Sequence, residues 1–173
     1  MIAAVSGEVI SRRGDHVVIE AAGVGYRLAV SAETLRSVPA VGERVSLHAH
    51  LIPRDDALAL YGFATEDERE LFLSLVSVSG IGPKVAMAAL SGGSTGELAR
   101  AIAAGDAKRF QAVPGIGKRT AERIIVELRE RIAGELGDDV STVDPEGSSR
   151  TEAREGLVGL GYTPVEAERL LGA

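Results

Sequence analysis

The first third of the chain alternates between apolar and polar positions in the manner of β-strands. Residues 26–30 and 45–51 alternate with a period of two, and residues 17–20 form a short apolar, β-branched run. Gly-Val-Gly at 23–25 and Pro-Arg-Asp-Asp at 53–56 have the composition of turns. Five or six short strands in about 60 residues predict a small closed barrel, with the five-stranded OB fold as one candidate.

The pattern changes at Thr65, after which apolar residues recur at helical spacing. The segment Thr65–Glu68 has the hydroxyl and the carboxylate three residues apart that form a capping box, and Ser94–Glu97 repeats this arrangement. The longest apolar stripe begins after Lys118 and comprises Ala121, Ile124, Ile125, Leu128 and Ile132, with Gly134 and Gly137 ending the helix. The sequence therefore predicts a compact all-helical domain.

The last part of the chain begins with a segment of linker composition that is rich in Asp, Ser and Gly. Two helix starts follow it, at Ser149 with Glu152 and at Thr163 with Pro164 in the first helical position. We therefore expect an α+β, multidomain chain with a barrel over residues 1–64, a helical domain over residues 65–137, a flexible linker over residues 138–150 and a small helical domain over residues 151–173.

The helical domain contains an internal repeat. Residues 78–86 (Val-Ser-Gly-Ile-Gly-Pro-Lys-Val-Ala) align with residues 113–121 (Val-Pro-Gly-Ile-Gly-Lys-Arg-Thr-Ala) at an offset of 35 residues. In each copy the first Gly permits a turn with positive φ, the Ile can anchor the turn in the core, and the second Gly lets another backbone approach closely. The next helix starts at once, so its free N–H groups and its positive dipole end form an anion site that suits a phosphate.

A single Gly-x-Gly favours a different interpretation, a tight connection between helices that only packs. The duplication, with Lys84 and then Lys118 and Arg119 at the helix starts, favours phosphate binding instead. Residues 108–123 contain five basic residues against the single acid Glu122, and two such sites suit the two strands of a duplex. Other nucleotide motifs fail, because Gly-Lys is not followed by Ser or Thr and neither Gly-x-Gly continues to a third Gly at dinucleotide spacing.

Composition excludes several classes of protein. The chain has no Cys, which excludes disulfides, iron–sulfur clusters and thiolate zinc sites. It has no Trp, three Tyr and three Phe, so recognition of bases by aromatic stacking is not expected. The net charge of −6 argues against a generally basic surface, but residues 138–173 hold 3 basic and 8 acidic residues, a net −5, so local charge decides about partners.

Neither a membrane span nor a signal peptide is visible. No apolar stretch approaches the roughly 18 residues that a span requires, and the N-terminus lacks a basic start and a long apolar run. We therefore expect a cytoplasmic protein without a membrane partner.

The paired motifs Gly-Ile-Gly-Pro-Lys at 80–84 and Pro-Gly-Ile-Gly-Lys-Arg-Thr-Ala-Glu-Arg at 114–123 look like helix-hairpin-helix motifs. Together with the preceding barrel, with Tyr-Gly-Phe at 61–63 and with Leu-Gly-Tyr at 160–162, they make the whole chain resemble the RuvA family of bacterial Holliday-junction-recognition subunits. The resemblance implies an OB-fold barrel, a helical domain with two hairpins and a mobile small helical (UBA-like) domain.

The resemblance also implies a function in recombination and DNA repair. Members of the family form homotetramers that hold a four-way DNA junction open, with one or two tetramers per junction. Each hairpin contacts the DNA backbone independently of sequence, and the family needs no cofactor and supplies no catalytic residue. The matching DNA-binding positions are Ser79, Gly80, Gly82, Lys84, Gly115, Gly117, Lys118, Arg119, Thr120 and Arg123.

Asp55 and Asp56 fall where the family carries an acidic pin, whose carboxylates repel phosphates at the junction centre. Taken alone, these residues favour an ordinary acidic turn. Leu157, Leu160 and Tyr162 match the surface that binds the RuvB motor, a hexameric AAA+ ATPase, although the same residues could form the core of the tail. The RuvC resolvase is a further partner that the resemblance implies.

Three alternatives stay open at this point. The first is a helix-hairpin-helix repair enzyme, a glycosylase or nuclease, with Asp138 or Asp139 as the catalytic acid; Arg119 then occupies the position of the catalytic Lys, and a guanidinium cannot act as a Schiff-base amine. The second is a general duplex-binding domain. The third is a metal site at His48 and His50, for which no further ligand motif is present.

Overall fold

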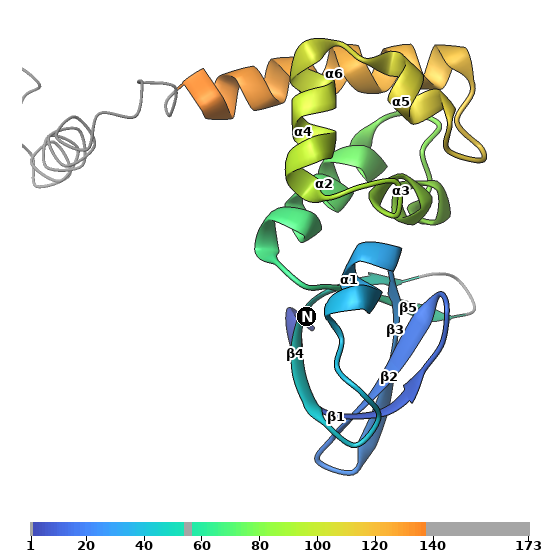
Figure 1. Cartoon of the computed structure of the whole chain (residues 1–173), viewed down its shortest axis with the longest axis vertical. Helices are drawn as coiled ribbons and strands as arrows, with labels where there is room; N and C mark the ends of the chain where they lie inside the picture. Colours follow the sequence, from blue (N-terminus) through green and yellow to red (C-terminus); the bar gives the residue numbers. More distant parts are fainter. Residues whose placement is uncertain (1, 54–56, 138–173) are drawn as a thin grey trace, which may run out of the picture. The chain divides into compact units, whose positions relative to one another are not determined.

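The computed structural model describes residues 2–53 and 57–137 (Figure 1). The chain divides into two compact units, residues 1–133 and residues 134–173. The described residues comprise most of the first unit and residues 134–137 of the second. Several predicted features lie outside the described residues: the linker, the helix starts after it, Asp55, Asp56, Leu157, Leu160 and Tyr162.

The N-terminal part is a closed five-stranded barrel, as the alternating pattern predicts (Figure 1). The strand order is β1-β2-β3-β5-β4, and every pairing is antiparallel except the parallel pair of β3 and β5 that closes the barrel. The strands are β1 (Ala4–Arg12), β2 (His16–Ala21), β3 (Val24–Val30), β4 (Arg44–Pro53) and β5 (Leu58–Phe63).

The core of the barrel follows from the register of the strands. Val9 pairs with Ile19, and both side chains are fully buried because alternate residues of the two strands point to the same side. On the closing pair, Leu28 lies opposite Leu60 and fills the same core. The apolar positions of the alternating segments therefore face inward.

A short helix that the alternating pattern does not predict, α1 (Ala32–Ser37), connects β3 to β4. The Ser31 hydroxyl caps it by accepting a hydrogen bond from the Thr34 amide at 2.9 Å. The helix has six residues, fewer than two turns, so it carries too little apolar periodicity to stand out in the sequence.

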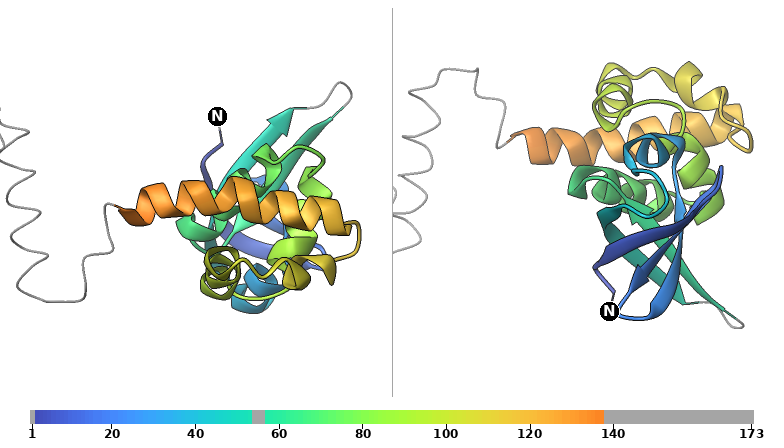
Figure 2. Two further views of the ribbon diagram at one scale, coloured as in Figure 1. Left: turned by 90° about the horizontal axis from the view of Figure 1, so that it is seen from above. Right: turned by 60° about the horizontal axis from the view of Figure 1, so that its bottom comes forward.

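The helical part is confirmed as an all-helical arrangement with one continuous core. Phe72, Leu75 and Ile102 are fully buried, and the Phe72 ring also packs against Tyr61 and Phe63 of the barrel at centroid distances of 5.1 and 5.0 Å. Figure 2 shows the last helix as a single straight element. The helices are α2 (Glu66–Ser77), α3 (Pro83–Leu90), α4 (Thr95–Ala104), α5 (Ala107–Gln111) and α6 (Lys118–Gly137).

The two predicted capping boxes have different outcomes. At Ser94 both halves form, because the hydroxyl accepts from the Glu97 amide and the Glu97 carboxylate accepts from the Ser94 amide. At Thr65 the hydroxyl accepts from the Glu68 amide, but the Glu68 carboxylate does not return to the Thr65 amide. The prediction of a complete box at Thr65 is therefore wrong.

The Glu68 carboxylate instead joins the barrel to the helices. It is buried and accepts hydrogen bonds from Ser31 Oγ at 2.5 Å, from Thr34 Oγ1 at 2.5 Å and from the Ala64 amide at 3.1 Å. A buried carboxylate is tolerated only when its oxygens are hydrogen-bonded in this way. The first turn of α2 is thereby fixed to α1 of the barrel.

Candidate nucleic-acid interface

The first copy of the repeat forms a tight turn between α2 and α3. The Val78 amide donates to the Leu75 carbonyl at 3.1 Å, and the Ile81 amide donates to the Val78 carbonyl at 3.0 Å. Gly80 has a φ of +88°, a left-handed conformation that favours glycine. Ile81 is 5% exposed and anchors the turn in the core, as the repeat predicts.

The second copy reproduces this turn between α5 and α6. The Val113 amide donates to the Phe110 carbonyl at 3.1 Å, and the Ile116 amide donates to the Val113 carbonyl at 3.0 Å. Gly115 has a φ of +91°, and Ile116 is 4% exposed. The repeat in the sequence is therefore a repeat in backbone geometry.

The second glycine of each hairpin has a different character. Gly82 and Gly117 are exposed, and a Cβ atom at either position would meet no atom of the described chain within 4 Å. Gly82 has an extended backbone with φ of −88° and ψ of 167°, and neither glycine is left-handed. The fold of the chain therefore requires no glycine here, and the space in front of each backbone is open to another molecule.

Each open glycine leads directly into a helix. Pro83 is the first residue of α3, which leaves the Lys84 amide pointing out of that end. At the start of α6, the amides of Lys118 and Arg119 donate to no acceptor among the described residues. These unpaired amides, with the positive end of each helix dipole, attract an anion such as a phosphate.

Basic side chains surround both helix starts. Lys84, Lys118 and Arg119 are exposed, and Lys118 forms the one ion pair of the three within the described part of the chain, a 4.0 Å contact with Glu122. An exposed pair at that distance contributes little to stability. The three cationic groups are therefore available to a polyanion, and Thr120, which is half-buried, adds a hydroxyl beside them.

The two hairpins contact one another. Arg123 Nη1 of α6 donates to the Ser79 carbonyl of the first hairpin at 2.8 Å. In the opposite direction, Val85 Cγ2 of α3 lies 3.5 Å from the position that a Cβ of Gly115 would take. The structure thus brings two of the DNA-binding candidates, Ser79 and Arg123, into direct contact, and their role stays a prediction. The Arg123 contact spans 44 residues, and no sequence signal indicated it.

Arg109, a member of the predicted basic run, points elsewhere. Its Nη2 lies 3.3 Å from the Gly92 carbonyl and 3.5 Å from Glu97 Oε2. The pKa of Glu97 is lowered, first by its hydrogen bond with the Ser94 amide and then by the Ser94 hydroxyl and the Arg109 charge. Arg109 therefore contacts Gly92 and the first turn of α4 rather than the hairpin turns.

The two histidines of the candidate metal site are engaged with α2. His48 Nδ1 lies 2.8 Å from Glu66 Oε2, and the His50 ring packs edge-on against Phe72 at 6.2 Å. Burial, and then the Arg69 charge, lower the pKa of His50, while the hydrogen bond from Arg69 is the main cause of a lowered pKa at Glu66. Within residues 2–53 and 57–137, no three potential ligands cluster around an ion site.

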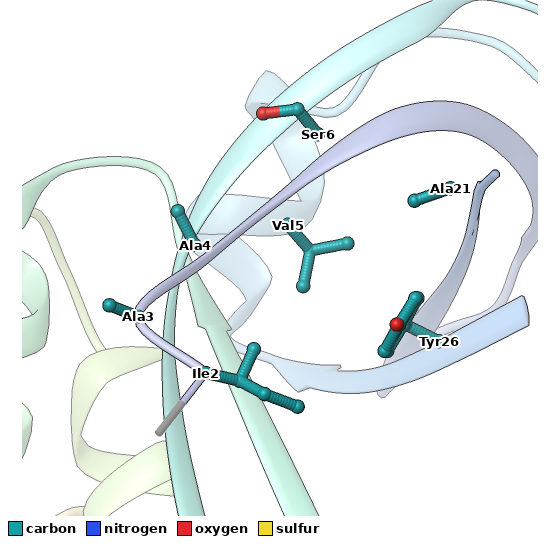
Figure 3. Close-up of a pocket in the computed structure, with 7 residues that line it drawn as sticks. All are labelled: Ile2, Ala3, Ala4, Val5, Ser6, Ala21 and Tyr26. Atoms are coloured by element: carbon teal, nitrogen blue, oxygen red, sulfur yellow. The ribbon is translucent and has the colours of Figure 1, made fainter. Parts of the chain in front are cut away.

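A hollow of about 290 Å³ lies on the barrel beside the start of β1 (Figure 3). Apart from the hydroxyls of Ser6 and Tyr26, the side chains around it are apolar. It offers no charged group to a phosphate.

No helix in the described part of the chain is long and apolar enough to cross a membrane.

Comparison with known proteins agrees with these two parts of the fold. The family described as "RuvA N terminal domain" matches residues 1–62, and the family described as "SAM-like Helix-hairpin-helix tandem" matches residues 72–130.

Relatives match along nearly the whole chain, and each is named "Holliday junction branch migration complex subunit RuvA". The protein of Rubrobacter xylanophilus is 46% identical over 99% of this chain and 88% of its own length. Those of Halorhodospira halophila and Pseudomonas entomophila are 45% and 43% identical, over 98% and 100% of this chain and 87% and 89% of their own lengths. Because the identity is this high over almost the full length, the chain belongs to the RuvA family.

Proposed function

We propose that this chain recognises four-way DNA junctions without regard to base sequence and acts as the junction-binding subunit of a branch migration complex. The observation that carries the proposal is the open space before Gly82 and Gly117, at two hairpins of the same backbone geometry. Its relatives are named as subunits of the Holliday junction branch migration complex, which supports the same function.

The hairpins bind through the DNA backbone. A phosphate in front of each open glycine accepts hydrogen bonds from the amides at the helix start, and the exposed Lys84, Lys118 and Arg119 add charge. Such contacts position the protein but read no base, which suits a junction that moves along DNA. Because phosphates dominate, the logarithm of affinity falls with the logarithm of salt concentration by about 0.9 per phosphate neutralised.

The proposed function also requires several copies of the chain on one junction. A homotetramer provides one subunit for each arm of the junction, with Asp55 and Asp56 as acidic pins at the centre. The chain itself supplies no catalytic group. ATP hydrolysis belongs to the RuvB motor, which docks on Leu157, Leu160 and Tyr162, and RuvC is a further partner. The complex works in the cytoplasm, where the chromosome of a bacterium lies.

The test is the double variant Gly82→Glu with Gly117→Glu. A Cβ at either position meets no described atom within 4 Å and neither backbone is left-handed, so the barrel and the helices should fold as before. The two carboxylates would stand in the proposed phosphate positions, and we expect junction affinity to fall on the order of 100-fold, because charge repulsion replaces amide contacts. A native gel with four-way junction, duplex and single strand, together with the mass of the complex, measures this loss and the number of subunits.

A matched control introduces the same charge elsewhere. Gly14 and Gly96 also have open space at the Cβ position and are not left-handed, so Gly14→Glu with Gly96→Glu changes net charge equally. We expect this control to bind the junction nearly as the unaltered protein does. Equal affinity of the two double variants would refute binding through the hairpins.

A further inference from the structure

The helix that follows the second hairpin also reaches the first. Arg123 lies in the second turn of α6, and its Nη1 donates to the Ser79 carbonyl oxygen at 2.8 Å. Ser79 directly precedes Gly80, and a Cβ at Gly80 would lie 4.0 Å from the same Arg123 nitrogen. The guanidinium therefore rests against the turn that holds the left-handed glycine of the first hairpin.

This contact is not part of the repeat. The residue 35 positions before Arg123 is Ala88, whose methyl group can make no reciprocal hydrogen bond. The reverse contact, from Val85 to the position of a Gly115 Cβ, is apolar. Arg123 of the second copy thus has no counterpart in the first copy, and its hydrogen bond joins the two copies.

Within the described residues, this hydrogen bond is the one side-chain contact made by Arg123 to a hydrogen-bond acceptor. Among the described residues, no carboxylate pairs with Arg123, and no other group donates to the Ser79 carbonyl oxygen. A guanidinium is planar and donates in fixed directions, so this bond restricts the orientation of the turn as well as its distance from α6. The separation of the hairpins is what must match two strands of one duplex.

We propose that Arg123 is a positioning residue that holds the two hairpins in register through the Ser79 carbonyl, an inference that rests on the proposed function of the hairpins as a pair of phosphate-binding sites. A simple phosphate contact requires only the positive charge. A positioning bond requires the guanidinium and acts before any DNA is present.

The experiment compares Arg123→Lys with Arg129→Lys in the full-length protein. Lysine keeps the charge but ends one atom short of Nη1 and lacks the planar donor group. Arg129 is exposed on the same helix and has no bonded partner among the described residues, so it provides the control. Hydrogen exchange of the amides of residues 79–82 is measured without DNA, alongside the unfolding midpoint and junction affinity at several salt concentrations.

For Arg123→Lys we expect exchange at residues 79–82 to quicken about tenfold, with exchange at residues 115–117 and the unfolding midpoint unchanged, because only the first turn loses a restraint. Junction affinity should fall about tenfold although no charge is lost. Unchanged exchange at residues 79–82, or full junction affinity, would overturn the proposal. If the unaltered protein failed to bind junctions, the proposed function would fail, while the exchange measurement would still decide whether Arg123 holds the turn.

Discussion

Gly80 and Gly115 have φ angles of +88° and +91°, whereas Gly82 and Gly117 are not left-handed and face open space. The first pair is required by the fold of the chain, because any other L-residue is strained in the left-handed region. The second pair is not required by the backbone conformation of the chain. In the proposed function, the same residue type serves folding at one position of the hairpin and binding two residues later.

Alanine substitutions should separate these two requirements. Gly80→Ala and Gly115→Ala should each lower the free energy of unfolding by about 1 kcal/mol or more, the cost of a left-handed Cβ. Gly82→Ala and Gly117→Ala should change it by less than about 0.5 kcal/mol, because the freedom that the unfolded chain loses offsets the weaker helix cap that Ala provides. Urea denaturation of the four variants measures the difference. A Gly82→Ala variant as destabilised as Gly80→Ala would show that the fold does need glycine there.

Residue by residue, the sequence predicted what is local. The Gly-Ile-Gly spacing identified both turns and the buried anchors Ile81 and Ile116. It could not identify the bond from Arg123 to Ser79, since a partner 44 residues away is set by tertiary packing. For the same reason Glu68, at capping-box spacing from Thr65, was assigned to the wrong partner.

Among the elements, α1 and α2 form the connection between the barrel and the hairpins. Glu68 of α2 accepts from Ser31 and Thr34, and the Ala32 amide of α1 donates to Ser91 Oγ at 3.0 Å just after α3. The start of α2 and the residue that follows α3 are thereby both fixed to α1. Because the alternating pattern does not predict α1, this connection could not be predicted either, and the parallel pairing of β3 with β5 likewise has no signal in the sequence.

Removal of the buried carboxylate should be costly. Glu68→Ala leaves the hydroxyls of Ser31 and Thr34 without their acceptor in a buried site, while the Ala64 amide keeps Thr34 Oγ1 at 3.2 Å, and we expect the free energy of unfolding to fall by about 3 kcal/mol. Glu70→Ala, which removes an exposed carboxylate from the same helix, should change it by less than about 0.5 kcal/mol. Thermal or urea unfolding compares them, and equal stabilities would contradict the role assigned to Glu68.

At the scale of the whole molecule, charge is distributed unevenly. The net charge is −6, yet the exposed cations Lys84, Lys118 and Arg119 gather at the hairpins. Binding to a polyanion is therefore a local property, and acidic groups elsewhere limit where DNA can lie. The proposed pin residues Asp55 and Asp56 belong to this second group.

Neutralising the proposed pin tests whether these acidic groups limit where DNA can lie. Asp55→Asn with Asp56→Asn should raise affinity for plain duplex severalfold and impair strand separation at the junction, because repulsion of phosphates is lost. Asp67→Asn with Glu70→Gln removes two exposed carboxylates from α2 and should leave the ratio of duplex to junction affinity as it is. Gel shifts on both substrates give that ratio. If the two double variants behave alike, the pin has no special role.

The contrast between the two glycines of each hairpin also has an evolutionary consequence. In a descendant lineage released from its nucleic-acid partner, positions 82 and 117 would be free to drift to other residues, since no atom of residues 2–53 and 57–137 lies where their Cβ would be. Positions 80 and 115 would stay glycine for as long as the chain still folded. In such a lineage, substitutions that abolish binding, at positions 82 and 117, would therefore appear before substitutions that unfold the chain.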